Sequence, residues 1–133
     1  MKKSILTTIA ATVMLLFISH NGKAQTQKIT PKATVEIIQF HSERRCMTCN
    51  KIEKLTRQTL KDFPAIPFSL VNVDDSKNEK KATQFEATGT ALFLYNPKTA
   101  KIKNLTDFAF MTAGDEVKFQ KELKKQIQLF LKG

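Results

Sequence analysis

The sequence predicts an α/β domain built on a four-stranded mixed sheet flanked by helices, in the order strand, helix, strand, helix, strand, strand, helix. Three observations support this prediction. Apolar segments rich in β-forming residues alternate with segments whose apolar residues recur every three or four positions. The first two strands flank a helix, which requires a right-handed parallel crossover. A short turn separates the last two strands, which indicates an antiparallel hairpin.

A buried strand and an amphipathic helix are predicted for the first part of the domain. Residues 34–40 are mostly apolar and rich in β-branched side chains, as expected of a buried strand. From 47 to 63 apolar residues recur in steps that favour a helix with one buried face. These residues are Ile52, Leu55, Leu60 and Phe63. Pro64 then ends the helix, because proline lacks the amide hydrogen that a helix interior needs.

A second strand and a second helix follow. Residues 67–73 carry four apolar side chains and are followed by two aspartates, which end the strand. Ser76 and Glu79 fit a capping box, in which each side chain bonds the backbone of the other residue. This pattern predicts a helix over 77–86, with Ala82 and Phe85 facing inward.

The last part of the chain predicts a hairpin and a long helix. Residues 91–95 and 101–107 are the expected third and fourth strands, joined by a turn at Asn96-Pro97-Lys98-Thr99. Residues 108–111 are expected to pack on the core as an apolar segment. Gly114 and Asp115 open a helix that runs to Leu131. Its apolar face comprises Phe119, Leu123, Ile127 and Phe130.

The first 24 residues have the layout of a secretory signal peptide. A positively charged start precedes an apolar run over 5–18, and Gly22 and Ala24 place small residues at a cleavage site. As a helix this run would reach roughly 21 Å, short of the roughly 30 Å hydrocarbon core, which disfavours an anchor. We predict a signal peptide over 1–24, a flexible lead-in over 25–33 and one domain over 34–133. The mature protein should be periplasmic or secreted, and not embedded in a membrane.

The chain as a whole carries a net positive charge. Cleavage after Ala24 would leave 19 basic and 12 acidic residues, a net charge of +7. Because lysines occur in every predicted helix of an exported chain, we interpret them as solvated helix faces rather than a nucleic-acid surface. An anionic membrane surface or an acidic partner remains the alternative. We expect a monomer that has no nucleic-acid partner and no bound cofactor.

The two cysteines, Cys46 and Cys49, are the strongest functional signal. They lie three residues apart at the start of a helix that follows a strand, so their sulfurs can approach to bonding distance. Free backbone N–H groups at a helix start favour a thiolate at Cys46, and Arg44 and Arg45 should lower its pKa further. Cys46 should therefore be the exposed nucleophile and Cys49 the more buried resolving thiol.

Two other uses of the cysteine pair are possible. A purely structural disulfide would close a loop of four residues and remove little unfolded-state entropy. A metal site would need more ligands, because the mature chain offers only His41 besides the two cysteines. A thiolate pair could still bind a soft ion such as copper(I) or arsenic(III) without redox turnover. Thiol–disulfide exchange is the function that the pattern favours.

The motif and its surroundings resemble the thioredoxin-like superfamily over nearly the whole mature chain. More narrowly, "FHSERRCMTCNKIEK", "VNVDD" and "TGTALFLY" resemble the exported proteins grouped as the nitrophenyl-compound nitroreductase subunit ArsF family. This resemblance implies electron transfer with a redox partner protein, such as a membrane thiol-reductant carrier. It also implies a link to the reduction of, or resistance to, arsenicals.

The sequence departs from ordinary thioredoxins at three places. Met47-Thr48 replaces the Gly-Pro between the cysteines, and Gln39 or Phe40 stands near the place of the buried acid. Ala91 stands where thioredoxins have a cis-proline facing the cysteines. A cis bond before alanine would cost roughly 3 to 4 kcal/mol, so we predict a trans bond between Thr90 and Ala91. These two residues should line a widened groove close to Cys46.

Overall fold

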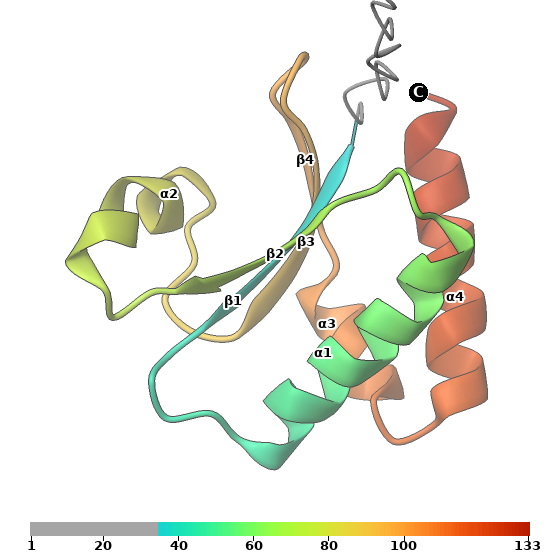
Figure 1. Ribbon diagram of the computed structural model, residues 1–133, viewed down its shortest axis with the longest axis horizontal. Coiled ribbons are helices and arrows are strands. Elements are labelled where there is room, and N and C mark those ends of the chain that lie inside the picture. Colours follow the sequence, from blue (N-terminus) through green and yellow to red (C-terminus); the bar gives the residue numbers. More distant parts are fainter. Residues whose placement is uncertain (1–34) are drawn as a thin grey trace, which may run out of the picture.

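The computed structural model describes residues 35–133 (Figure 1). The strands are β1 (Glu36–His41), β2 (Phe68–Asn72), β3 (Ala91–Asn96) and β4 (Lys101–Asn104). The α-helices are α1 (Met47–Thr59), α2 (Glu79–Gln84), α3 (Thr106–Thr112) and α4 (Glu116–Leu131). Two short 3₁₀ turns, η1 (Leu60–Asp62) and η2 (Ser76–Asn78), extend α1 and precede α2. No helix in this part of the chain is both long enough and apolar enough to cross a membrane.

The four strands form one mixed sheet in the order β2-β1-β3-β4. β1 pairs in parallel with β2 and antiparallel with β3, and β3 pairs antiparallel with β4. Helices α1, α3 and α4 lie on one side of the sheet, and α2 lies on the other (Figure 1). The predicted mixed α/β sheet, with its parallel crossover and terminal hairpin, is confirmed.

The central strand β1 supplies apolar side chains to two separate cores. Successive side chains of a strand point to opposite faces, and Ile37 packs on the α1–α4 side while Ile38 and Phe40 pack on the α2 side. The α2-side core is aromatic, with the rings of Phe85 and Phe93 each within 6 Å of Phe40. On the opposite side, the four apolar residues predicted for the last helix are all buried. Because β1 is buried on both faces of the sheet, its end is held in place, and the loop that leads to Cys46 starts there.

The predicted capping box at Ser76 and Glu79 is wrong. The Asp75 carboxylate accepts a hydrogen bond from the Lys77 amide instead, and Ser76 begins the η2 turn. Asp75 can take this role because its side chain reaches an amide two residues ahead. The helix therefore starts later and ends earlier than predicted, although Ala82 and Phe85 are buried as expected.

The segment after β4 also differs from its prediction. The strand ends at Asn104 instead of 107, and α3 follows directly. Leu105, Ala109 and Ala113 are buried at helical spacing, whereas Phe110 and Met111 are exposed. The helical period was not visible in the sequence, because no polar residue interrupts the apolar run at 108–111. The Asn104 side chain accepts a hydrogen bond from the Thr106 amide at the turn into the helix.

The predicted signal peptide (1–24) and lead-in (25–33) lie outside the described residues. The domain is described from Val35, one residue after its predicted start at Thr34.

Candidate functional site

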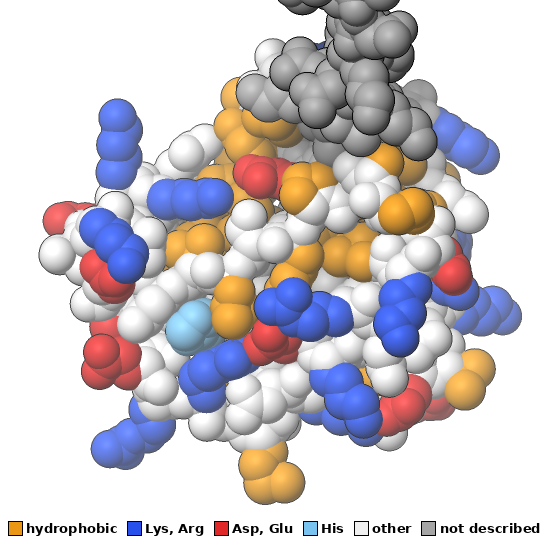
Figure 2. Space-filling view, in the orientation of Figure 1, with side chains coloured by type: hydrophobic (Ala, Val, Ile, Leu, Met, Phe, Trp, Pro, Cys, Tyr) orange, Lys and Arg blue, Asp and Glu red, His pale blue; other side chains and the backbone are white. Residues whose placement is uncertain are grey.

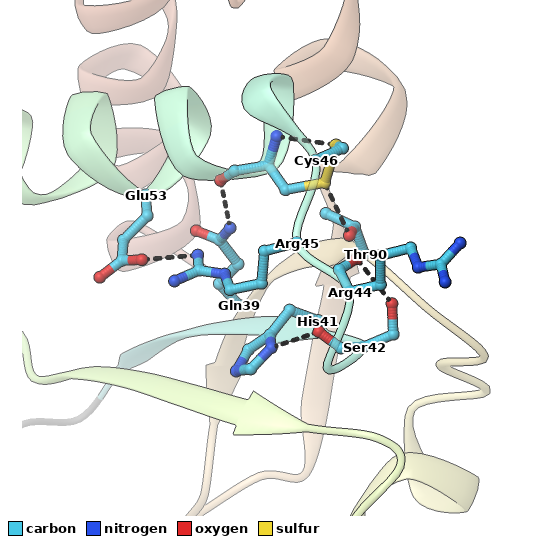
Figure 3. Close-up of a disulfide and its surroundings, with 9 residues drawn as sticks. Gln39, His41, Ser42, Arg44, Arg45, Cys46, Glu53 and Thr90 are labelled. Carbon is cyan, nitrogen blue, oxygen red and sulfur yellow. Dashed lines mark hydrogen bonds and ion pairs between the residues drawn. A yellow bond between two sulfur atoms is a disulfide. The ribbon is translucent and has the colours of Figure 1, made fainter.

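Cys46 and Cys49 form a disulfide at the start of α1 (Figure 3). β1 ends at His41, a short loop follows, and Cys46 is the residue that caps the helix. The two Cα atoms are 5.1 Å apart, within the ordinary range for a disulfide. The helix start therefore brings the two sulfurs together through local geometry alone.

The two sulfurs have different surroundings. Cys46 is exposed, and its Sγ accepts a hydrogen bond of 3.1 Å from the Cys49 amide. Cys49 is buried, with 4% of its surface exposed. The predicted order of exposure is confirmed. An incoming sulfur can reach Cys46, and the amide that points at Cys46 would stabilise negative charge on it.

Thr90 contacts the buried sulfur. Its hydroxyl Oγ1 donates a hydrogen bond of 3.1 Å to Cys49 Sγ. The described residues contain no cis peptide bond, so the predicted trans bond between Thr90 and Ala91 is confirmed. The loop lies beside the cysteine pair as expected, but its hydrogen bond is to Cys49, whereas the prediction placed it near Cys46. Ala91 begins β3 and pairs with Phe40.

Gln39 connects the central strand to the first turn of α1 by a hydrogen bond. This residue of β1 is fully buried on the α1 side, and its Nε2 donates a hydrogen bond of 3.0 Å to the Cys49 carbonyl. Its Oε1 is also buried and has no hydrogen-bond partner among the described residues. A polar residue in an apolar strand was a visible signal in the sequence, but its partner was not predictable. Gln39 ties the resolving cysteine to the central strand.

Arg45 is engaged in an ion-pair network on α1. Its guanidinium lies 2.6 Å from the carboxylate of Glu53, which also pairs with Arg57 at 2.8 Å. Figure 3 shows the Arg45 side chain directed at Glu53 and the Arg44 side chain directed to the opposite side. Neither arginine points at the disulfide. Their expected influence on the Cys46 pKa would therefore act through space, and the Glu53 charge offsets that of Arg45.

The Glu53 carboxylate has a shifted pKa. Burial is the largest single influence and raises the pKa, but hydrogen bonds and charges from Arg45 and Arg57 leave it below the ordinary 4.5. A carboxylate with a lowered pKa in the folded state stabilises the fold above its unfolded pKa, and this contribution disappears as the pH falls through the folded value.

We therefore expect the free energy of unfolding of wild type to exceed that of Glu53→Gln above about pH 4.5, with the difference shrinking at lower pH. Urea unfolding of both proteins at several pH values measures this difference. Glu79→Gln, at an exposed position outside the network, is the matched control. A difference that stays constant down to acid pH would show that Glu53 acts through packing rather than charge.

His41 does not join the cysteines in a metal-binding cluster. Its Nδ1 donates a hydrogen bond of 2.8 Å to the Ser42 carbonyl. Within residues 35–133, no three His, Cys, Asp or Glu side chains are grouped so that they could hold a metal ion. A soft ion would therefore have to be bound by the two reduced thiols without a third ligand of these types.

A groove of about 370 Å³ lies next to the first turn of α1. It is lined by Met47, Thr48, Lys51, Phe110, Ala113 and Gly114. The widened groove predicted from the sequence was assigned to Thr90 and Ala91, and neither residue lines this one. Three of the lining residues belong to α1 and three to α3 and the turn after it. Helix α3, which the sequence did not predict, and the turn after it therefore supply half of the lining residues of this groove.

Comparison with known proteins gives a partial structural likeness. An X-ray structure of Fasciola hepatica thioredoxin aligns with a TM-score of 0.41 and 23% sequence identity. The alignment covers 49% of this chain and 61% of that chain. No protein-family model matches the sequence, and no curated protein matches it. The strand order β2-β1-β3-β4, the parallel crossover and the cysteine pair that opens α1 make this a thioredoxin-like α/β fold.

Proposed function

We propose that this protein is a thiol–disulfide oxidoreductase or electron carrier. The observation that supports it best is the asymmetric disulfide at a helix start, with Cys46 exposed and Cys49 buried. A structural disulfide needs no accessible sulfur, whereas exchange requires one sulfur that a partner can reach.

The reaction passes two electrons from the reduced cysteine pair of the protein to the disulfide of a partner. The reduced Cys46 thiolate attacks one sulfur of a partner disulfide, which forms a mixed disulfide and releases the other partner sulfur as a thiolate. Cys49 then loses its proton and attacks Cys46 Sγ, which re-forms the internal disulfide and releases the second partner thiol. The partner is reduced, the protein is oxidised, and the proton from Cys49 neutralises a partner thiolate. The reverse sequence oxidises a partner dithiol.

Neighbouring groups support each sulfur in these steps. The Cys49 amide that bonds Cys46 Sγ would stabilise the attacking thiolate. The Thr90 hydroxyl bonds Cys49 Sγ and would donate to that sulfur when it becomes anionic. Arg44 and Arg45 add positive charge near the helix start and should lower the Cys46 pKa, with the effect of Arg45 reduced by Glu53.

Equilibration of the protein with glutathione buffers of graded potential tests the proposal. Exposed, exchangeable disulfides have reduction potentials above about −300 mV, whereas structural ones lie below that value. We expect a single two-electron transition above this limit, read as the fraction of protein that takes up a thiol-alkylating mass tag. A disulfide that stays oxidised throughout the series would assign Cys46 and Cys49 a structural role.

We further propose that the protein favours small or specialised partners over unfolded protein substrates. Ala91 in place of a proline, after a trans bond, leaves the loop without the geometry with which thioredoxins pair a substrate backbone. Insulin reduction by the reduced protein should therefore be slow, although 2-hydroxyethyl disulfide is reduced. Insulin reduction as fast as that of an ordinary thioredoxin would contradict the inference.

Export is proposed from the N-terminal sequence. Expression of the full chain in a bacterial host should yield a periplasmic or secreted protein that begins at Gln25. Intact mass of the isolated protein measures this directly, and replacement of Ala24 with a bulky residue should block or shift cleavage. A retained Met1 would indicate an anchored protein instead.

The narrower resemblance suggests a physiological setting. We propose that electrons come from a membrane thiol-reductant carrier and that the protein takes part in the reduction of, or resistance to, arsenicals. The support for this setting is the likeness of the "RRCMTC" and "TGTALFLY" segments to the exported family described above. Loss of the gene should then increase sensitivity to nitroaromatic arsenicals, and a variant lacking Cys46 should fail to restore resistance.

A further inference from the structure

The groove between α1 and α3 begins at Met47, the residue that follows Cys46. Cys46 caps α1, and the next two residues, Met47 and Thr48, already line the groove. A partner sulfur bonded to Cys46 would therefore carry its neighbouring residues to the mouth of this groove.

The surface around the groove is apolar and unusually exposed. Met47 and Phe110, which line the groove, are 90% and 42% exposed, and Met111, the residue after Phe110 in α3, is 84% exposed. Single exposed apolar side chains are common, but a group of them beside a hollow is typical of an interaction site. A Cβ atom added at Gly114 would meet no atom within 4 Å, so the space beside this residue is open. This open space leaves room for an apolar side chain of a partner.

The helices next to the groove account for most of the net positive charge of the described domain. α1, η1 and α4 together hold eight Lys and Arg against four Asp and Glu, a net charge of +4. The whole described domain has 17 against 12, a net charge of +5. Figure 2 shows Lys and Arg side chains over both the α1–α4 side and the α2 side, but outside α1, η1 and α4 the nine basic residues are nearly balanced by eight acidic ones. The charge is therefore concentrated on one layer rather than distributed evenly.

This positive surface begins at the groove itself. Lys51 lines the groove and bonds Glu116 at the start of α4, at 2.5 Å. Lys51 is the main cause of the lowered Glu116 pKa, and the charge of Lys54 adds to it, so both lysines lie near the same carboxylate. Lys54 and Lys121 are exposed farther along α1 and α4. An acidic partner would meet these charges as its sulfur reached Cys46.

We propose, on the basis of the function proposed above, that the groove and the basic α1–α4 layer form one docking surface. Its partner is an acidic protein segment that carries an apolar side chain beside its reactive disulfide. The acidic residues speed the encounter by electrostatic attraction, and the apolar side chain enters the groove beside Phe110 and holds the sulfurs in line.

Four synthetic peptides test both parts of the proposal. Each carries one cysteine in a disulfide with 5-thio-2-nitrobenzoate, whose release is coloured. Their flanking residues are acidic or basic, and the residue beside the cysteine is leucine or serine. With the reduced protein at low salt, the acidic leucine peptide should react about tenfold or more faster than the basic serine peptide, and added salt should reduce the charge advantage.

Variants separate the groove from the charge. Phe110→Ala and Gly114→Leu should each remove most of the difference in rate between the leucine and serine peptides. Phe110→Ala removes one wall of the groove, and Gly114→Leu fills part of the groove. The double charge reversal Lys54→Glu with Lys121→Glu should remove the acidic advantage. Leu129→Ala is the matched control for an exposed apolar side chain elsewhere on α4. Lys80→Glu with Lys98→Glu changes the net charge equally, away from this layer, and should leave the peptide preferences unchanged.

The outcomes distinguish the docking surface from the redox function. If 2-hydroxyethyl disulfide and all four peptides fail to react, the proposed function is wrong. If 2-hydroxyethyl disulfide reacts normally and the four peptides react equally, the docking surface alone is refuted. Equal peptide rates together with salt-sensitive binding to phosphatidylglycerol vesicles, lost in the double charge reversal of the α1–α4 layer, would instead assign the basic layer to a membrane surface.

Discussion

Cys46→Ser is expected to abolish disulfide reduction, because it removes the accessible sulfur. Cys49→Ser should keep the first attack and lose the second, because Cys49 supplies the buried thiol that resolves the mixed disulfide. In a single turnover of the pre-reduced proteins with 2-hydroxyethyl disulfide, wild type should release two mercaptoethanol molecules, Cys49→Ser one and Cys46→Ser almost none. This is the largest change in activity that we expect from any single substitution.

The two variants should differ in what they accumulate. Mixed with 2-hydroxyethyl disulfide alone, Cys49→Ser should retain one mercaptoethanol on Cys46, whereas Cys46→Ser should react slowly or not at all. Intact mass shows the adduct, and circular dichroism confirms that both proteins are folded. Asn50→Ala, an exposed change in the same helical turn, should turn over like wild type. Rapid adduct formation on Cys49 in the Cys46→Ser protein would reverse the roles assigned to the sulfurs.

Phe119→Ala should produce the largest loss of stability. Phe119 is fully buried on the inner face of α4, and its ring packs 5.2 Å from that of Phe108. Removal of a buried phenyl ring leaves a cavity, since the surrounding structure relaxes only in part. The free energy of unfolding should fall by about 3 to 5 kcal/mol, measured by urea denaturation.

This loss should be specific to the core. Leu131→Ala removes a half-exposed apolar side chain near the end of the same helix and should cost well under half as much. Because α4 packs against α1, local unfolding of α1 should be more frequent in the Phe119→Ala protein. Faster alkylation of Cys49 after reduction would measure this. Equal losses for the two substitutions would contradict the core position of Phe119.

The two predictions depend on different parts of the fold. The cysteine chemistry depends on local geometry at the start of α1, and the stability depends on long-range packing of α4 under the sheet. Gln39 connects them, because it belongs to the central strand and bonds the Cys49 carbonyl. Replacement of the helix start alone would therefore not reproduce the surroundings of the buried sulfur.

The sequence by itself determined the features that depend on local pattern. The strand β1 and the apolar face of α4 follow from the spacing of apolar residues in the sequence. Side chains with this spacing lie on one face of an element, and burying that face is favourable. The pairing of Cys46 with Cys49 and their order of exposure follow from a spacing of three at a helix start. The trans bond before Ala91 follows from the cost of a cis bond without proline.

Tertiary structure decided the features that depend on distant residues meeting. Thr90 bonds Cys49 across 41 positions of sequence, and Lys51 bonds Glu116 across 65, so no local pattern could assign either contact. The direction of Arg45 depended on Glu53, two helical turns away, as much as on the nearby cysteines. Helix α3 was not predicted, because its exposed Phe110 and Met111 stand in an apolar run that hides the helical period. Phe110 and the turn after α3 line a groove with α1 only because the tertiary structure places the two helices together.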